Sequence, residues 1–154
     1  MPRRSSLIVV VLGLTAACTA RAPSTPAYTP RTRDVTITAV PLLTKEMAAV
    51  YPFLREDFAP GGVLDGKEVY TFMPSTVTVV EGDTVHFTFV NPEDDKHLFT
   101  MADLAVTLPG QTITSATYVA RHAGIYRFVC DMPAHLPMMW GQLVVLTPKT
   151  IGAH

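Results

Sequence analysis

Apolar and polar residues alternate along two neighbouring stretches in the middle of the chain. Val77 and Val79 alternate with polar residues, and Val85, Phe87 and Phe89 continue the pattern a few residues later. An apolar residue at every second position is typical of strands that bury one face and expose the other. Two half-buried strands are therefore predicted here.

Other stretches predict further strands. Residues 112–120 and 141–146 have strand patterns, and Tyr126, Phe128 and Cys130 fall on one face of another predicted strand. The Cys130 thiol is therefore expected to point inward where that strand ends. Many short strands separated by turn residues predict an all-β fold, an antiparallel sandwich.

One segment has a different period. Its apolar residues recur at helical spacing, at Met47, Val50, Tyr51, Leu54 and Phe58. Residues 44–58 therefore predict a short helical insert with Thr44 as its cap, which Pro52 should kink or split. Turn residues follow, and then a strand over residues 68–73. The insert is expected to cap one end of the sandwich.

The N-terminus predicts export. Two Arg residues precede an apolar stretch over residues 7–14, which is too short to span a bilayer, and small residues then lead to Cys18. Residues 1–17 are interpreted as a signal peptide of the bacterial lipoprotein type, with lipid attached to Cys18. Export with cleavage at another site is the alternative.

The remaining chain divides into a tether and one domain. Residues 18–33 are rich in Pro, Ser, Thr and Ala and have little apolar content to bury, which predicts a disordered tether. Residues 34–154 are long enough for a single core and contain no internal repeat. If Cys18 carries lipid, Cys130 is left as the one free thiol of an exported protein, where a bound metal would protect it.

A short loop that begins at Cys130, where the strand predicted from Tyr126 and Phe128 ends, is rich in metal-binding side chains. It contains Cys130, His135 and Met139, which offer a thiolate, an imidazole and a thioether. His97, far upstream, completes a His-Cys-His set with a weak axial Met. Sulfur ligands select copper, and this set is the blue-copper arrangement.

The same residues allow other interpretations. The Met residues of the loop, which include Met132 and Met138, could fill a core, and Cys130 could be structural. The Pro residues around them argue against a core face. Zinc could use both His residues and the thiolate, but it gains little from a thioether. A second copper in this loop would need a second Cys, so we expect a mononuclear centre.

The order of these motifs resembles the cupredoxin family of small blue-copper proteins. The resemblance begins at residues 76–85 and continues through 109–111 and 123–130 to Trp140-Gly141-Gln142-Leu143-Val144-Val145. It implies a Greek-key β-sandwich that holds one copper ion at His97, Cys130 and His135. The family's loop spacing places its axial ligand at Met139, and Met138 is then part of an apolar rim. Leu98 and Ala134 depart from the family, which often has a polar residue after the first His and Gly before the second.

The resemblance implies a carrier of single electrons rather than an enzyme, because copper enzymes of this type need additional His-rich centres. A copper carrier that delivers the metal to an oxidase is the alternative. Residues 34–154 have seven Lys and Arg and thirteen Asp and Glu, a net charge of −6, which favours a cationic redox partner such as a basic cytochrome c or a terminal oxidase. The same charge disfavours nucleic acid. We expect a monomer held by its lipid on the outer face of a bacterial membrane.

Overall fold

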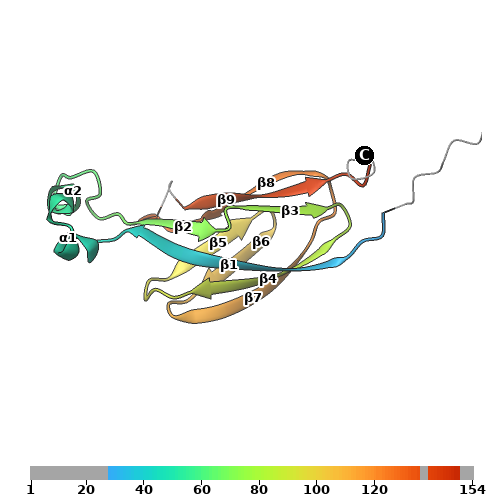
Figure 1. The fold of residues 1–154 in the computed structure, drawn as a ribbon, viewed down its shortest axis with the longest axis horizontal. Helices are drawn as coiled ribbons and strands as arrows, with labels where there is room; N and C mark the ends of the chain where they lie inside the picture. Colours follow the sequence, from blue (N-terminus) through green and yellow to red (C-terminus); the bar gives the residue numbers. More distant parts are fainter. Residues whose placement is uncertain (1–27, 136–138, 150–154) are drawn as a thin grey trace, which may run out of the picture.

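Alternating apolar residues build two β-sheets that face each other across a shared core (Figure 1). The computed structural model describes residues 28–135 and 139–149. One sheet has the order β2-β1-β4-β7, with bounds Val69–Met73, Thr32–Leu43, Thr84–Asn91 and Thr112–Val119. The other has the order β3-β9-β8-β5-β6, with bounds Thr76–Val80, Trp140–Leu146, Gly124–Cys130, His97–Met101 and Leu104–Leu108.

The predicted all-β sandwich is confirmed, since two sheets pack face to face and a short helical insert interrupts the strands. Most strand pairs are antiparallel, as expected. The pairs β1 with β4 and β3 with β9 are parallel. Parallel neighbours need a long connection, and here the intervening chain crosses between the two sheets.

Phenylalanine rings from both sheets form the centre of the core. Phe99 of β5 lies between the sheets, with its ring centroid 4.6 Å from that of Phe89 and 5.1 Å from that of Phe128. Phe72 packs edge-on against Phe99 at 5.5 Å. All four side chains are fully buried, and each contributes about 2–3 kcal/mol through the area it removes from water. The two strands that carry the predicted ligands, β5 and β8, are therefore held by a cluster of buried aromatic rings.

Gly141, the second residue of the final strand β9, is a position where no side chain fits. Gly141 lies opposite Phe128 in the β8–β9 pair. A Cβ atom at this position would lie only 2.2 Å from the Phe128 ring and 2.5 Å from the Ser75 carbonyl oxygen. The Trp-Gly step of the sequence motif is thus a packing requirement.

The folded domain begins earlier than the predicted boundary at Asp34. Strand β1 starts at Thr32, and the chain contacts the domain already at Tyr28. The Tyr28 hydroxyl, the Arg31 amide and the Arg33 guanidinium all donate to the carboxylate of Asp83. Residues 28–33, which the sequence analysis placed in the tether, therefore belong to the domain. The rest of the predicted tether and the signal peptide lie outside the described residues.

These contacts determine the charge of Asp83, whose side chain is fully buried. Burial by itself raises a carboxyl pKa, but the hydrogen bonds from Tyr28, Arg31 and Arg33, together with one from the Val80 amide, outweigh it and lower the pKa of Asp83 to about 2. The carboxylate thus joins the N-terminal segment to the turn between β3 and β4.

The helical insert consists of three short turns rather than one helix. These are α1 (Met47–Val50), a 3-10 turn η1 (Pro52–Leu54) and α2 (Arg55–Phe58). Pro52 splits the helix as predicted. Thr44 was predicted as the cap, but Glu46 occupies the cap position, and Thr44 contributes only its carbonyl oxygen to the Met47 amide.

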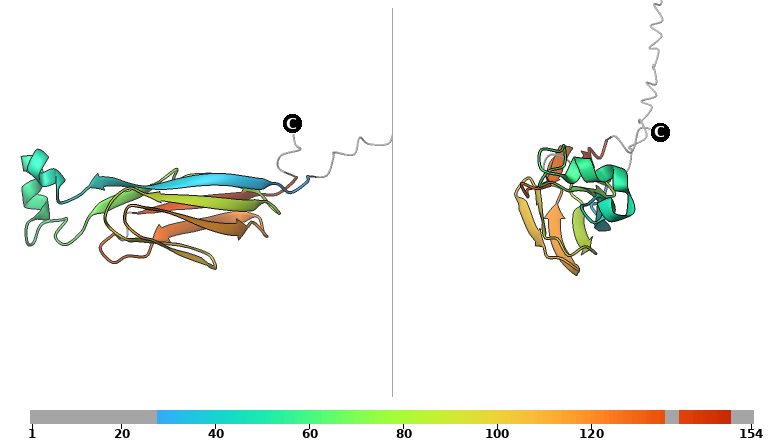
Figure 2. Two further views of the ribbon diagram at one scale, coloured as in Figure 1. Left: turned by 90° about the horizontal axis from the view of Figure 1, so that it is seen from below. Right: turned by 90° about the vertical axis from the view of Figure 1, so that its left-hand side faces the viewer.

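The insert projects beyond one end of the sandwich, and the first and last described residues lie at the other end (Figures 1 and 2). Leu54 and Leu64 are buried at the insert, whereas Phe53 is 75% exposed. Within the described residues, no helix has the length and apolar character needed to cross a membrane.

The Asp83 cluster predicts a pH-dependent contribution to stability. The folded-state pKa of about 2 lies below the ordinary value of 3.8, so this stabilisation is complete above pH 4 and disappears as the pH falls toward 2. Its size is about 2 kcal/mol. Urea unfolding of Asp83→Asn at pH 7 should show a loss of this order, and the difference from the wild type should shrink at pH 2. Asp34→Asn is the control, because that side chain is 89% exposed. Equal losses in both variants would contradict the prediction.

Candidate metal centre

Two neighbouring strands of one sheet carry the first two ligands. Strand β5 begins at His97 and β8 ends at Cys130, and Phe99 lies directly opposite Cys130 in this antiparallel pair. Just beyond the paired residues, the Asp131 amide donates to the Leu98 carbonyl oxygen at 2.9 Å. Leu98 thus joins the two ligand segments through its backbone rather than through its side chain.

The loop after β8 returns the third ligand to the same place. The His135 amide donates to the Met132 carbonyl oxygen at 2.9 Å, and the Met139 amide donates to that of His135 at 3.4 Å. The loop closes where the Cys130 amide donates to the Met139 carbonyl oxygen at 2.9 Å. Residues 136–138, which include Met138, lie outside the described residues.

The ligand atoms of the two His residues and Cys130 converge in the interior. The Nδ1 atoms of His97 and His135 are 3.1 Å apart, and the Cys130 Sγ atom lies 3.9 Å and 3.4 Å from them respectively. His97 and Cys130 are 0% exposed and His135 is 5% exposed. Bonds from a metal to nitrogen and sulfur are about 2.0–2.3 Å long, so atoms at these separations can all reach one ion.

Burial sets the protonation of these groups when no metal is bound. It lowers the pKa of His97 to about 4, helped by repulsion from His135, and lowers the pKa of His135 as well. Burial also raises the pKa of the Cys130 thiol. At neutral pH both imidazoles are therefore neutral and ready to bind, and the thiol gives up its proton when a metal enters.

Comparison with known proteins agrees with this geometry. A model of the cupredoxin-like domain matches residues 65–145. The chain belongs to the cupredoxin-like family. Comparison with curated protein sequences gives no significant match.

Solved structures of copper proteins have a similar fold. A copper nitrite reductase from Nitrosomonas europaea has a TM-score of 0.55 and 21% identity over 77% of this chain and 43% of its own. A multi-copper oxidase from Pseudomonas thermotolerans has a TM-score of 0.51 and 14% identity over 78% of this chain and 31% of its own. The cupredoxin-like domain thus spans less than half the length of either protein.

A smaller structure is also similar. It is auracyanin A, a "blue" copper protein from Chloroflexus aurantiacus, with a TM-score of 0.48 and 17% identity over 74% of this chain and 98% of its own. At these identities the similarity concerns the fold alone.

The donor set of the cupredoxin-like domain fits copper. The structure brings His97, Cys130 and His135 together as predicted, and these are the metal-binding cluster among the described residues. Met139 is fully buried and belongs to the same core cluster as Cys130. A thiolate, two imidazoles and a thioether form a type 1 copper site, because soft sulfur donors favour copper over hard cations. Cys18 lies outside the described residues, and its lipid attachment stays a prediction.

Two residues that the sequence analysis did not single out support the site. The Asn91 side-chain amide donates to the backbone carbonyl oxygens of Asp95, Leu108 and Pro109, which holds the loop that leads to His97. Tyr70 of β2 packs against both ligand imidazoles. The Asn-Pro step after β4 signals a turn, but no sequence pattern indicates that Tyr70 reaches across the two sheets.

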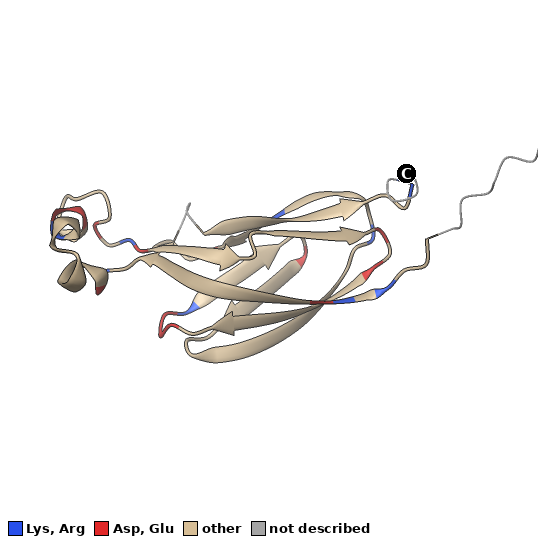
Figure 3. Cartoon of the chain, viewed as in Figure 1, with Lys and Arg blue, Asp and Glu red and all other residues tan. Residues whose placement is uncertain are grey.

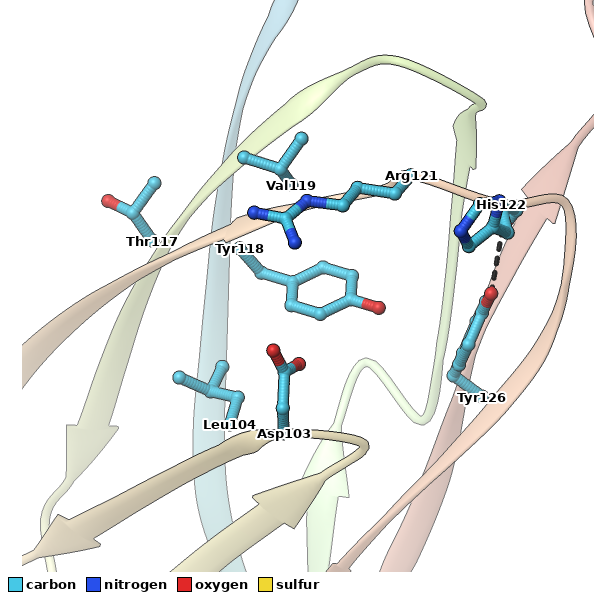
Figure 4. A pocket seen from close by; sticks show the side chains of 8 residues that line it. All are labelled: Asp103, Leu104, Thr117, Tyr118, Val119, Arg121, His122 and Tyr126. Carbon is cyan, nitrogen blue, oxygen red and sulfur yellow. Dashed lines mark hydrogen bonds between the residues drawn. The ribbon is translucent and has the colours of Figure 1, made fainter.

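A surface pocket of about 470 Å³ lies away from the metal centre (Figure 4). Residues of β6, β7, β8 and their connections line it, among them Asp103, Tyr118, Arg121 and Tyr126. Asp103 follows the end of β5 and Tyr126 is near the start of β8, so the pocket is at the opposite ends of the strands that carry His97 and Cys130. It shares no residue with the ligand set.

The axial ligand can be tested by changing the two adjacent Met residues separately. Met139→Leu should raise the reduction potential and change the copper spectrum, because loss of a weak thioether donor disfavours the oxidised ion. Met138→Leu is the matched control and should leave the spectrum nearly unchanged. Voltammetry and visible absorption of both copper-loaded variants measure this. The opposite pattern would assign the axial role to Met138.

Proposed function

We propose that this domain carries single electrons between redox partners at the cell envelope. The observation that supports this best is the convergence of His97, Cys130 and His135 at a buried site held by two paired strands. Copper supplies the redox chemistry by alternating between Cu(I) and Cu(II). The protein holds its ligands in one arrangement.

The protein's part in this function is to limit rearrangement. The backbone hydrogen bonds from Asp131 to Leu98 and from Cys130 to Met139 fix both ends of the ligand loop. Burial excludes water from the ligand atoms. Because the ligands cannot move far when the oxidation state of the copper changes, each electron transfer requires little structural rearrangement.

The proposed partner is a cationic redox protein, such as a basic cytochrome c or a terminal oxidase. The domain is acidic, and acidic side chains lie on the helical insert and in the loop that precedes β5 (Figure 3). Both segments are at the end of the sandwich that contains the ligands. A negative surface there would accelerate encounter with a basic partner and lose this effect in salt.

The electron-transfer proposal predicts three results for the copper-loaded protein. Visible absorption should show intense thiolate-to-copper charge transfer, which Cys130→Ser should abolish without unfolding the apo domain. Voltammetry should be reversible. Reduction by a basic cytochrome c should slow as salt is added, whereas reduction by an acidic redox protein should be slow at every salt concentration.

A copper carrier would behave differently in the same experiments. It would give up its ion to a competing copper-binding protein faster than it exchanges electrons. Rapid metal transfer together with irreversible voltammetry would contradict electron transfer and favour the carrier. We also propose that the protein is an electron carrier and has no enzymatic activity of its own.

Attachment to the membrane through Cys18 is a further part of the proposal. The sequence before Cys18 supports it, and the described chain enters the domain at the end opposite the insert. Cys18→Ala should release the protein from the membrane fraction or leave its signal peptide in place. Mass spectrometry of the native protein that finds no acyl chain and cleavage elsewhere would contradict lipid attachment.

A further inference from the structure

Tyr70 contacts both imidazole ligands from the opposite sheet. It belongs to β2, whereas His97 belongs to β5, and its side chain is only 2% exposed. The Tyr70 ring centroid lies 4.7 Å from that of His97 and 4.7 Å from that of His135. The two imidazole centroids are 4.8 Å apart. The three rings therefore form a nearly equilateral triangle in which each ring restricts the other two.

The Tyr70 hydroxyl is bound between two carboxyl groups. It is 2.6 Å from Asp95 Oδ2 and 2.9 Å from Glu68 Oε2. One hydroxyl proton can serve only one of these bonds, so one carboxyl group must contribute a proton of its own.

The two carboxyl groups are themselves fixed by the backbone. The Lys45 amide donates to Glu68 Oε1 at 3.0 Å, and the Glu68 amide donates to the Ala134 carbonyl oxygen at 3.3 Å. Asn91 holds the Asp95 backbone at 2.7 Å. The hydroxyl of Tyr70 is thus anchored to the base of the helical insert, to the loop before His97 and to the loop that contains His135.

His97 has a special need for such a contact. The second ring nitrogen of a metal-binding His normally donates to a carboxylate or a carbonyl group, which fixes the ring. The Nε2 atom of His97 is buried and has no hydrogen-bond partner among the residues that the structure describes. The orientation of this ring therefore depends on packing, and the Tyr70 ring packs against it in a T-shaped contact with an interplanar angle of 72°.

We propose that Tyr70 is a positioning residue that fixes both imidazole ligands through its ring, with Glu68 and Asp95 anchoring its hydroxyl group. This inference rests on copper binding at the proposed site and adds a residue to it. The Tyr70 hydroxyl is bound to the two carboxyl groups and is not offered as a ligand. The ring would restrict how far the two imidazoles can turn when a bound copper ion is oxidised or reduced.

Two substitutions separate the ring from its anchor. Tyr70→Leu removes the aromatic ring, and Tyr70→Phe keeps the ring but loses both hydrogen bonds. Tyr126→Phe is the matched control, because the Tyr126 hydroxyl donates to the His122 carbonyl oxygen at an exposed position away from the site. The visible and electron paramagnetic resonance spectra of the copper-loaded proteins, their electron self-exchange rates and the melting temperatures of the apo proteins should be measured together.

We expect Tyr70→Leu to shift and broaden the copper spectra and to slow self-exchange about tenfold, a typical effect of losing an outer contact of a metal ligand. Tyr70→Phe should lie between this variant and the wild type, and Tyr126→Phe should match the wild type. A purely structural role of Tyr70 would lower the melting temperature and leave the spectra and exchange rate unchanged, which would overturn the proposal.

The outcomes distinguish this inference from the function on which it rests. If wild-type protein loaded with copper lacks thiolate charge transfer, the proposed function fails first. If the wild type shows it and Tyr70→Leu is identical to the wild type, only the role of Tyr70 fails. Should Tyr70→Leu not fold, Tyr70→Phe decides, and wild-type spectra and exchange in that variant would overturn the proposal.

Discussion

Phe99 lies opposite Cys130 where β5 pairs with β8, and the position of every ligand depends on this register. The same pair places Phe99 and Phe128 in the aromatic core, with ring centroids 5.1 Å apart. A slip of one residue would turn Cys130 to the opposite face of its strand and would remove Phe128 from the core. The metal site and the hydrophobic core are therefore specified by one set of hydrogen bonds, and neither can form correctly without the other.

The location of the site inside this core has an energetic cost. Two imidazoles and a thiol occupy space that aliphatic side chains would fill more favourably, and burial keeps all three uncharged at neutral pH. The cost is offset when a metal replaces the thiol proton and bonds to all three groups. Apolar surroundings also weaken competition by water. The metal-free domain is thus less stable than one with aliphatic side chains at these positions, but its ligands have a well-defined geometry.

The sequence predicted the parts of this structure that depend on local patterns. Strands with strict alternation, such as β4 and β8, were placed within a residue or two, and the ligand set was found because three of its members share one loop. Strand β1 was missed although Val35, Ile37 and Ala39 alternate with polar residues, and its parallel pairing with β4 is non-local. Strands β5 and β6 were not assigned because their apolar residues do not alternate cleanly with polar ones, and in β5 the polar His97 is on the buried face. Tyr70 could not be recognised, since its contacts arise only when the two sheets pack.

The insert between β1 and β2 begins and ends at neighbouring points. Leu43 and Val69 are paired residues of these two strands, so the twenty-odd residues between them leave and re-enter the sheet at nearly the same place. Lengthening or replacing the outer part of this segment, between Lys45 and Glu68, changes loop entropy only slightly and leaves both the sheet register and the anchors of Tyr70 intact. The end of the sandwich that contains the ligands can consequently have a different outer shape in related chains while the ligand set stays the same. Recognition and redox behaviour could in this way evolve independently on one scaffold.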